Sequence, residues 1–407
     1  MEGGRTKLSE WQLVPFHLGA AIGPMGSNVF TVLFTILLGA FDVDRSILTL
    51  AVPAYLFPYA IVQFASGAVS DLTSRRSSLF IGFGGYGAAS LLAALSPNFP
   101  VFLVSQVLQG TTNAFTTPIV MATLGDVVPR ERIGRSMGYF SAVNQAGAMV
   151  GPLVAGALGD LNWRLAYLVI TAMSWSLAIW YALWFRRYGA LVPPRVRGES
   201  IGASLRAIVA SLGVPVLLLA GIAFLANGAM RGASYLYAEY LSNTWGSGTG
   251  QVGIILSMYG LAGLLGGPGA GRLVDRVGPY RGLTAGMVGV ALAFLLMAAA
   301  PSPLVLAVAH FGVGLAGIVA WSAFNTLVVQ AVPESRGTVS SITGSAKFIG
   351  QGSAPLWYTP LYGMSPASIF VGAAAMAVLV LAPLARLRTI AAAREHAPVH
   401  EPAARGR

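Results

Sequence analysis

Three ionisable side chains lie inside long apolar stretches of the sequence: Arg231, Glu239 and Lys347. A charged group in a hydrocarbon layer is costly, so residues of this kind are by default candidates for binding a substrate or an ion. Arg231 shares one helical face with Asn227 and Tyr235, because the three residues are spaced four positions apart. Two bases beside a single carboxylate would make a cavity electropositive, and such cavities attract anions. The residue types therefore favour a site for a negatively charged small molecule.

These residues also have a second interpretation. Glu239 lies beside two tyrosines near the end of its apolar stretch, where it either reaches the interface or acts as a gate or proton site. Lys347 lies too deep in its stretch to reach the interface easily, and Gln351 is one helical turn further on. Aromatic residues such as Trp321 could instead form a broad apolar surface for amphipathic compounds, although aromatic residues in membrane helices more often serve packing.

The composition excludes an ordinary soluble domain. Of the 407 residues, 55% are hydrophobic and only 10% are charged, with a mean hydropathy of +0.70, whereas about a quarter of the residues of a soluble domain are charged. The sequence has no cysteine, hence no thiolate metal site or cysteine nucleophile, and it shows no nucleophile–base pair, metal cluster or phosphate loop. We therefore expect a membrane protein that is not an enzyme, without catalytic residues, cofactor or metal.

Twelve apolar runs approach the length of about 20 residues that a helix needs to cross a bilayer. They lie near residues 12–40, 47–69, 77–95, 101–124, 137–158, 165–184, 213–240, 251–273, 282–300, 303–329, 339–361 and 369–384. Of the 25 Lys and Arg residues, 21 lie in the tails and connections on one side of these runs, and only Arg45 and Arg164 lie on the other. Because basic residues concentrate on the cytoplasmic side, both termini are predicted to be cytoplasmic. The net charge of +11 is thus explained by topology, and we expect no nucleic acid as partner.

The chain contains an internal duplication. Gly67 and Asp71 recur as Gly271 and Asp275, each pair 204 positions apart, in a turn between two apolar runs. The same offset relates four further pairs: Gly110 and Gly314, Pro129 and Pro333, Arg132 and Arg336, and Ser136 and Ser340. Glycine allows two helices to approach closely at such a turn, and the arginines that follow stay in the aqueous layer. The sequence therefore predicts two homologous halves.

The turn resembles the loop signature of the major facilitator superfamily, Gly-x-x-x-Asp-(Arg/Lys)-x-Gly-(Arg/Lys)-(Arg/Lys), which lies between helices 2 and 3 and, in weaker form, between helices 8 and 9. The first copy departs from it at Leu72 and Ser74, and the second has Pro279. The resemblance implies a conformational role for Gly67, Asp71, Arg75, Arg76, Gly271, Asp275, Arg276 and Gly278.

A second motif lies in the fifth run. Small residues separated by eight, three and three positions give a smooth helix face, and the proline bends the helix. The motif consists of Gly138, Gly147, Gly151, Pro152 and Gly156. It is similar to the helix 5 signature of antiporters in the same superfamily, and we expect it to act as a hinge; generic glycine packing is the alternative.

The fourth run departs from the exporter pattern Arg-x-x-Gln-Gly, in which the arginine is linked to proton coupling. Gln106 occupies the position of that arginine, and the duplication relates Gln106 to His310. In this fold helices 1, 4, 7 and 10 line the central cavity, so His310 would lie deep in the cavity and could titrate near neutral pH. A neutral histidine hydrogen-bonded to a neighbouring helix is the alternative.

The resemblance implies an all-α membrane protein of twelve transmembrane helices in two pseudo-symmetric six-helix bundles. We expect the first bundle at residues 1–185, a cytoplasmic linker at 186–206, the second bundle at 207–388 and a cytoplasmic tail at 389–407. The candidate substrate or coupling residues are Asn28, Gln106, Asn113, Asn227, Arg231, Tyr235, His310, Trp321, Lys347 and Gln351, with His310 and Glu239 as possible proton sites.

The predicted function is secondary active transport of a small molecule across the cytoplasmic membrane by alternating access. Proton-coupled efflux of drugs or metabolites is the leading hypothesis because of the helix 5 motif. Exchange or uptake of an organic anion through Arg231 and Lys347 is the alternative, and a membrane receptor or enzyme is a distant third. The expected partners are the substrate, protons or a counter-transported ion and the lipid bilayer, and the chain is expected to be a monomer.

Overall fold

The protein is helical throughout the part of the chain that the structure describes. The structure, a computed structural model, describes residues 8–72, 74–192, 206, 212–331 and 336–395, and only the backbone of 65–72, 331, 336, 337, 394 and 395. The first half contains α1 (Glu10–Phe41), α2 (Arg45–Leu48), α3 (Ala51–Leu72), α4 (Arg75–Leu79), the π-helix η1 (Phe80–Gly84), α5 (Gly85–Leu95), α6 (Phe99–Asn113), α7 (Thr117–Val127), α8 (Arg130–Tyr188) and η2 (Gly189–Leu191). The second half contains α10 (Val214–Asn227), the π-helix η3 (Gly228–Gly232), the 3-10 helix η4 (Ala233–Leu236), α11 (Tyr237–Trp245), α12 (Thr249–Val277), α13 (Pro279–Ala298), α14 (Pro303–Ala331), α15 (Arg336–Gly352), α16 (Ala354–Met364), α17 (Ser368–Leu379) and α18 (Leu381–Glu395).

Nine helical segments within the described residues are long and apolar enough to cross a membrane. Proline accounts for part of the difference between these nine segments and the twelve runs predicted from the sequence. The run at 101–124 is divided into α6 and α7 just before Pro118, where Thr116 Oγ1 donates to the backbone oxygen of Asn113 at 2.8 Å. The run at 339–361 is divided at Ser353, just before Pro355. A proline lacks the N–H of a helical hydrogen bond, so each run becomes two helices too short to be counted as a span.

α8 covers the fifth and sixth predicted runs. It has 59 residues, more than twice what one crossing needs, and its backbone leaves the helical region at Asn162 (φ −165°, ψ 114°). The expected linker at 186–206 and tail at 389–407 lie largely outside the described residues.

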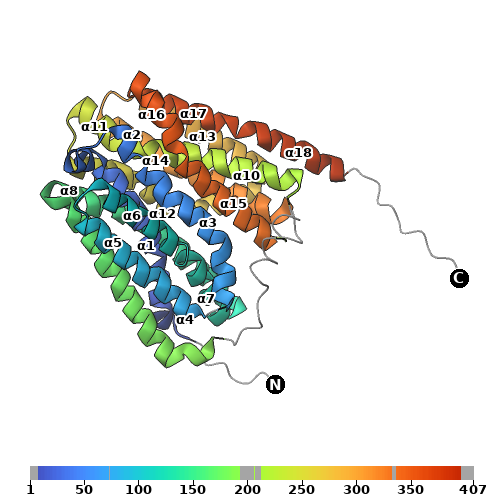
Figure 1. Ribbon diagram of the computed structural model, residues 1–407. Coiled ribbons are helices and arrows are strands. Elements are labelled where there is room, and N and C mark those ends of the chain that lie inside the picture. Colours follow the sequence, from blue (N-terminus) through green and yellow to red (C-terminus); the bar gives the residue numbers. More distant parts are fainter. Residues whose placement is uncertain (1–7, 73, 193–205, 207–211, 332–335, 396–407) are drawn as a thin grey trace.

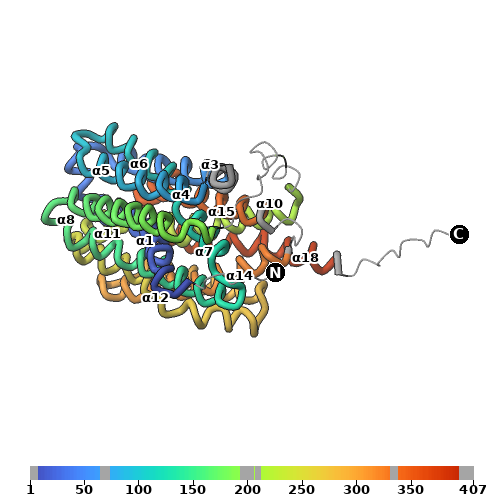
Figure 2. Tube along the Cα trace, turned by 90° about the horizontal axis from the view of Figure 1, so that it is seen from below, coloured from blue at the N-terminus to red at the C-terminus, as the bar shows by residue number. Residues whose placement is uncertain are grey.

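The two halves form two groups of helices. Figure 1 shows most of the first half, blue to green, below most of the second half, yellow to red, with α3 beside α15. α8 packs along α1 in its own half and along α12 of the other half, and the three helices can be followed side by side in Figure 2. These helices position the cavity described below.

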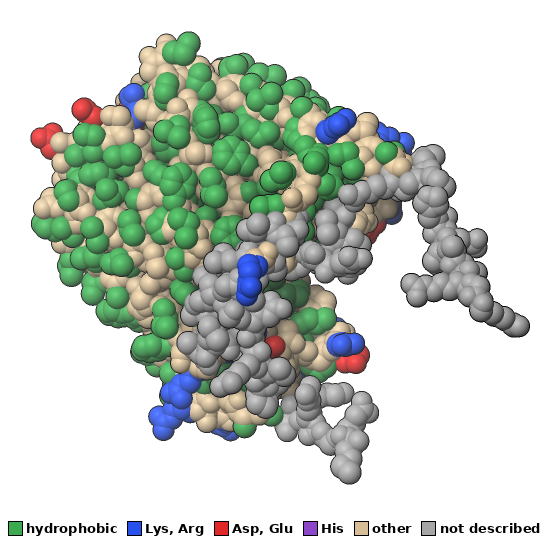
Figure 3. Space-filling view, turned by 45° about the vertical axis from the view of Figure 1, so that its right-hand side comes forward, with side chains coloured by type: hydrophobic (Ala, Val, Ile, Leu, Met, Phe, Trp, Pro, Cys, Tyr) green, Lys and Arg blue, Asp and Glu red, His purple; other side chains and the backbone are tan. Residues whose placement is uncertain are grey.

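The outer surface is apolar over a broad area. Figure 3 shows hydrophobic side chains over the middle of one face, with most of the charged side chains toward its two ends. Several large apolar side chains project outward, for example Leu304, which is 73% exposed, and Leu356, which is 70% exposed. An outward-facing apolar belt between charged ends is the surface expected of a protein that contacts lipid.

Candidate functional site

A cavity of about 460 Å³ lies between the two halves. Its volume is in the range of pockets that hold small organic molecules. The first half contributes Ser27 from α1, Tyr55 and Tyr59 from α3 and Asn113 from α6, among others. The second half contributes Asn227, Arg231, Tyr259, Trp321, Lys347 and Gln351. Six of the ten candidate substrate or coupling residues therefore lie at one cavity: Asn113, Asn227, Arg231, Trp321, Lys347 and Gln351.

Arg231 is held at the cavity wall by contacts with both halves. Its Nη2 donates to Asn28 Oδ1 at 3.1 Å, and its guanidinium carbon lies 4.7 Å from the centroid of the Tyr259 ring. Asn28 is fixed in turn, because its Nδ2 donates to the backbone oxygen of Pro24 at 2.6 Å. Arg231 lies in η3, a π-helical turn within the seventh predicted run, and such turns are frequent at functional sites. The described hydrogen bond of Arg231 uses one of the five N–H donors of its guanidinium.

Lys347 also lines the cavity from the second half, within an aromatic environment. Its Nζ is 4.2 Å from the centroid of Phe348 and 5.1 Å from that of Trp321. The Phe348 ring also contacts Tyr59 of the first half at 4.3 Å between centroids. Cations over aromatic faces gain stabilisation without a counter-charge.

The cavity is electropositive within the described part of the chain. Among the described residues that line it, Arg231 and Lys347 are charged, and neither Asp nor Glu is present. Neither base forms an ion pair with a described residue. The expected pair of bases is therefore brought to one cavity, together with aromatic surfaces that an apolar group could contact.

Neutral polar side chains complete the lining, and two of them donate hydrogen bonds to tyrosine hydroxyls. Asn113 Nδ2 donates to the Tyr55 hydroxyl at 2.7 Å, and Gln351 Nε2 donates to the Tyr235 hydroxyl at 2.6 Å. A smaller cavity of about 20 Å³ adjoins the central one, sharing Ser27 and Tyr55, and it is lined by Gln106 and Tyr235. Gln106 and Tyr235 thus lie next to the main site instead of in it.

The two possible proton sites lie away from the central cavity. His310 is 2% exposed, and its Nδ1 is 2.9 Å from the backbone oxygen of Ile255. The Tyr237 and Tyr259 rings pack on it, so its neighbours all belong to the second half. Glu239 contacts the first half, because Arg45 Nε donates to its Oε2 at 2.6 Å.

The helix 5 motif lies where α8 approaches its neighbouring helices closely. A side chain at Gly147 would collide with the Ala21 carbonyl oxygen of α1, and a Cβ at Gly156 would lie 2.7 Å from the Thr249 carbonyl oxygen of α12. Gly138, in contrast, has nothing within 4 Å of such a Cβ. The motif therefore packs α8 against α1 of the first half and α12 of the second half, except at Gly138.

The loop motif is only partly described, because residues 65–72, which include Gly67 and Asp71, are described by their backbone alone. Arg75 Nε donates to Asp126 Oδ2 on α7 at 3.0 Å, an ion pair within the first half. In the second copy, Asp275 and Arg276 are exposed, and Gly278 ends α12 with a φ of +83° that a residue with a side chain rarely adopts.

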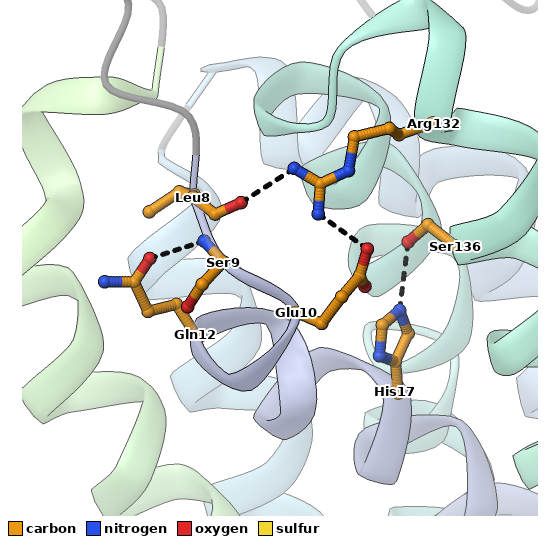
Figure 4. Close-up of polar contacts among 7 residues, drawn as sticks. All are labelled: Leu8, Ser9, Glu10, Gln12, His17, Arg132 and Ser136. Atoms are coloured by element: carbon orange, nitrogen blue, oxygen red, sulfur yellow. Dashed lines mark hydrogen bonds and ion pairs between the residues drawn. The ribbon is translucent and has the colours of Figure 1, made fainter.

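A further polar cluster was not predicted from the sequence (Figure 4). Arg132 donates to Glu10 Oε1 at 2.6 Å and to the backbone oxygen of Leu8 at 3.0 Å, and His17 Nε2 is 2.9 Å from Ser136 Oγ. These contacts fix the start of α1 to the start of α8. The only sequence signal was that Arg132 and Ser136 take part in the duplication, which does not reveal their partners.

The family follows from comparison with known proteins. A family model described as Major Facilitator Superfamily matches residues 16–355 and, in a second match, residues 219–405. The chain belongs to this superfamily. It is accordingly a multi-pass membrane transporter, a class of protein that acts on small molecules and is not enzymatic.

Relatives within the superfamily are distant. The chain is 30% identical over 296 residues to the multidrug resistance protein MdtG of Enterobacter lignolyticus, with 71% of this chain and 70% of that protein covered. It is 24% identical over 334 residues to the uncharacterised MFS-type transporter YceJ of Bacillus subtilis, with 80% and 83% covered. Among solved structures, a bacterial homologue of the human lysosomal transporter Spinster, inward-facing and unoccupied, matches with a TM-score of 0.74 at 17% identity, covering 95% of this chain and 98% of that one. The last match concerns the fold alone.

Proposed function

We propose that this protein is a secondary transporter that exports amphipathic organic anions, drugs or metabolites, across the cytoplasmic membrane by alternating access. The observation that carries the proposal is the cavity between the two halves, with two bases and no carboxylate among its described lining residues. A site at the boundary of two repeats is where such transporters hold their cargo while one half moves against the other. The relative MdtG is a multidrug resistance protein, which supports export of drug-like compounds.

The proposed topology has twelve crossings with both termini in the cytoplasm, in a monomer. The length of α8 and its interruption at Asn162 support two crossings in that helix. The α6–α7 and α15–α16 pairs support one crossing each. The excess of bases on one side of the predicted runs supports the orientation.

Uptake or exchange of a carboxylate through Arg231 and Lys347 is the second candidate, since the cavity's charge favours an anion whatever the direction of transport. The aromatic surfaces of Trp321 and Phe348 beside Lys347 favour cargo that also carries an apolar body. Export of lipophilic cations fits the cavity less well, because a cation would meet two like charges.

A ligand screen tests the substrate class. A compound that binds the folded state stabilises it by RT ln(1 + L/Kd), where L is the free ligand concentration, so the melting temperature rises once L exceeds Kd. We expect aromatic carboxylates to raise the melting temperature of the purified protein, and amines built on the same rings to leave it unchanged. Stabilisation by the amines and not by the carboxylates would overturn the assignment and favour a cation exporter.

We also propose that export is coupled to protons, with Glu239 better placed than His310. A proton can drive a conformational change only if its affinity differs between the two conformations. Glu239 faces Arg45 from α2 and Tyr362 from α16, so its surroundings change when the halves separate. The described hydrogen bond and ring contacts of His310 are with residues of its own half.

The two sites can be distinguished by neutralising each one. Transport by the Glu239→Gln variant should depend less on pH than transport by the parent, whereas the His310→Gln variant should keep the parent's profile. A profile flattened by His310→Gln alone, between about pH 5.5 and 7.5, would assign the proton to the histidine instead.

A further inference from the structure

An arginine fork joins the two halves of the molecule away from the central cavity. Arg45 of α2 donates from Nε to Glu239 Oε2 at 2.6 Å and from Nη2 to Oε1 at 2.5 Å. Its guanidinium carbon lies 4.3 Å from the centroid of the Tyr362 ring on α16. Two-pronged contacts between arginine and a carboxylate are among the stronger polar interactions in proteins. The Glu239 side chain is only 8% exposed, so its charge relies on this partner.

The fork lies at the end of the molecule opposite the start of the first helix. α1 has 32 residues, which corresponds to about 48 Å at 1.5 Å per residue, and Arg45 follows its far end. The contact of Arg132 with Leu8 and Glu10 lies at the near end. Among the described residues, the pair of Arg45 and Glu239 is the ion pair that connects the halves, because Arg75–Asp126 and Arg132–Glu10 each lie within the first half.

The packing of α8 against α12, which also joins the halves, is suited to persist while the halves rotate. α8 and α12 meet through glycines and backbone atoms, with Gly156 close to the Thr249 carbonyl oxygen and Gly260 close to the Met149 backbone. Smooth backbone packing of this kind has no charge pair to break when one helix rolls on another. The arginine fork, in contrast, is directional and is lost once its two sides move apart.

The helix that carries Glu239 also carries the cavity residue Arg231. Between them the backbone passes from the π-helix η3 to the 3-10 helix η4, and Leu236 at the end of η4 has φ −101° and ψ 1°, outside the α-helical range. The nine-residue helix α11 is therefore separated from α10 by two irregular turns. Irregular turns let one segment of a helix reorient without the other. The tip at Glu239 can thus reorient while the segment around Arg231 keeps its place at the cavity wall.

We propose that the Arg45–Glu239 pair is the contact that keeps the cavity closed at the end remote from the start of α1, and that it must break for the cavity to open there. Tyr362 is a positioning residue: its ring supports the guanidinium, and Asn243 Nδ2 holds its hydroxyl at 3.2 Å. The inference goes beyond the proposed function, since it requires two alternating conformations but neither an anionic substrate nor proton coupling.

Distances between spin labels test this proposal in the absence of any ligand. The chain has no cysteine, so Leu161→Cys and Met364→Cys provide two unique labelling sites, one on each half, at residues that are 77% and 80% exposed. Both lie toward the end that carries the fork: Leu161 beside the interruption of α8, and Met364 two residues after Tyr362. The doubly labelled protein that keeps Arg45 and Glu239 should show one dominant distance between the two labels.

Neutralising one side of the pair should populate a longer distance. Removing a contact that is present only in the closed state shifts the equilibrium toward the open state. Couplings of this kind typically change such an equilibrium by about fivefold or more. In Glu239→Gln we expect the population at the longer distance to rise at least about fivefold. Arg45→Gln should have the same effect. Because Arg45 is the more exposed partner, this variant replaces Glu239→Gln if the latter is too unstable to purify. The exchanged pair Arg45→Glu with Glu239→Arg should return the distribution toward the parent's.

Arg164→Gln is the matched control. Arg164 is the other base on this side of the predicted runs, but its guanidinium donates to backbone oxygens of Ala94 and Ser96 in its own half, at 2.6 and 2.9 Å. Its removal should leave the distance distribution unchanged. A parent-like distribution in both single variants of the pair, or a shift of the same size in Arg164→Gln, would overturn the proposal. Neither outcome bears on ligand binding, so failure here is distinct from failure of the proposed substrate class.

Discussion

Replacing Arg231 with glutamine should weaken the binding of an organic anion by a predictable amount. The substitution removes the charge while the glutamine amide can still bond to Asn28, so the wall of the cavity is kept. A hydrogen bond to a charged group contributes about 1.5–3 kcal/mol, and each 1.4 kcal/mol corresponds to a tenfold change in Kd. We therefore expect the Kd of an aromatic carboxylate to rise by about 10-fold to 150-fold. Lys347→Gln should have an effect in the same range, because its Nζ also has no described counter-charge.

Isothermal titration calorimetry on purified protein measures this effect directly. Arg231→Lys should recover part of the affinity, since the charge returns without the planar fork. Arg272→Gln is the control, because Arg272 is an exposed base on α12 that does not line the cavity. Parent-like affinity in both Arg231→Gln and Lys347→Gln would refute the reasoning, as would an equal loss in Arg272→Gln.

Two further substitutions probe packing and orientation. Gly147→Ala should lower the free energy of unfolding by about 1–3 kcal/mol, because its Cβ would meet the Ala21 carbonyl oxygen. If the variant stays folded, the same collision should impair transport. Gly138→Ala in the same motif should be neutral or slightly stabilising in the same denaturation assay, and equal losses in the two would remove the packing argument. A cysteine introduced at Ser302 should react with an impermeant thiol reagent from outside the cell, whereas one at Ser77 should not, and the reverse pattern would invert the topology.

The sequence predicted the family and much of the cavity, for physical reasons that can be traced. Charged residues such as Arg231 and Lys347 are expensive in an apolar helix, so their presence indicated a cavity before its shape was known, and both line it. The 204-residue offset of the duplication relates Arg231 to Ser27, which is next to Asn28, and Arg231 donates a hydrogen bond to Asn28 in the structure.

Other features depended on local backbone geometry that a regular period does not describe. Asn227, Arg231 and Tyr235 share a face only on a regular α-helix, but a π-helix and a 3-10 helix intervene. As a result Asn227 and Arg231 line the central cavity, while Tyr235 lines the smaller cavity beside it. The duplication likewise related Gln106 to His310 in depth without fixing which way either side chain points.

Ion pairs between residues far apart in the sequence could not be predicted from one sequence. Arg45 and Glu239 are 194 positions apart, and nothing in either neighbourhood indicates the other. Arg132 and Glu10 are separated by 122 positions in the same way. Such pairs are decided by how the helices pack, which the apolar pattern constrains only loosely.

Flux into sealed vesicles tests the central claim most directly. Purified protein is reconstituted into liposomes with an acidic interior, and the movement of a labelled aromatic carboxylate is compared with that of an amine on the same ring. We predict that the proton gradient drives accumulation of the carboxylate in the vesicles, in exchange for protons that leave, and that Arg231→Gln reduces this accumulation at subsaturating concentration by at least about tenfold. Accumulation of the amine by the parent protein, with the carboxylate unmoved, would contradict the account.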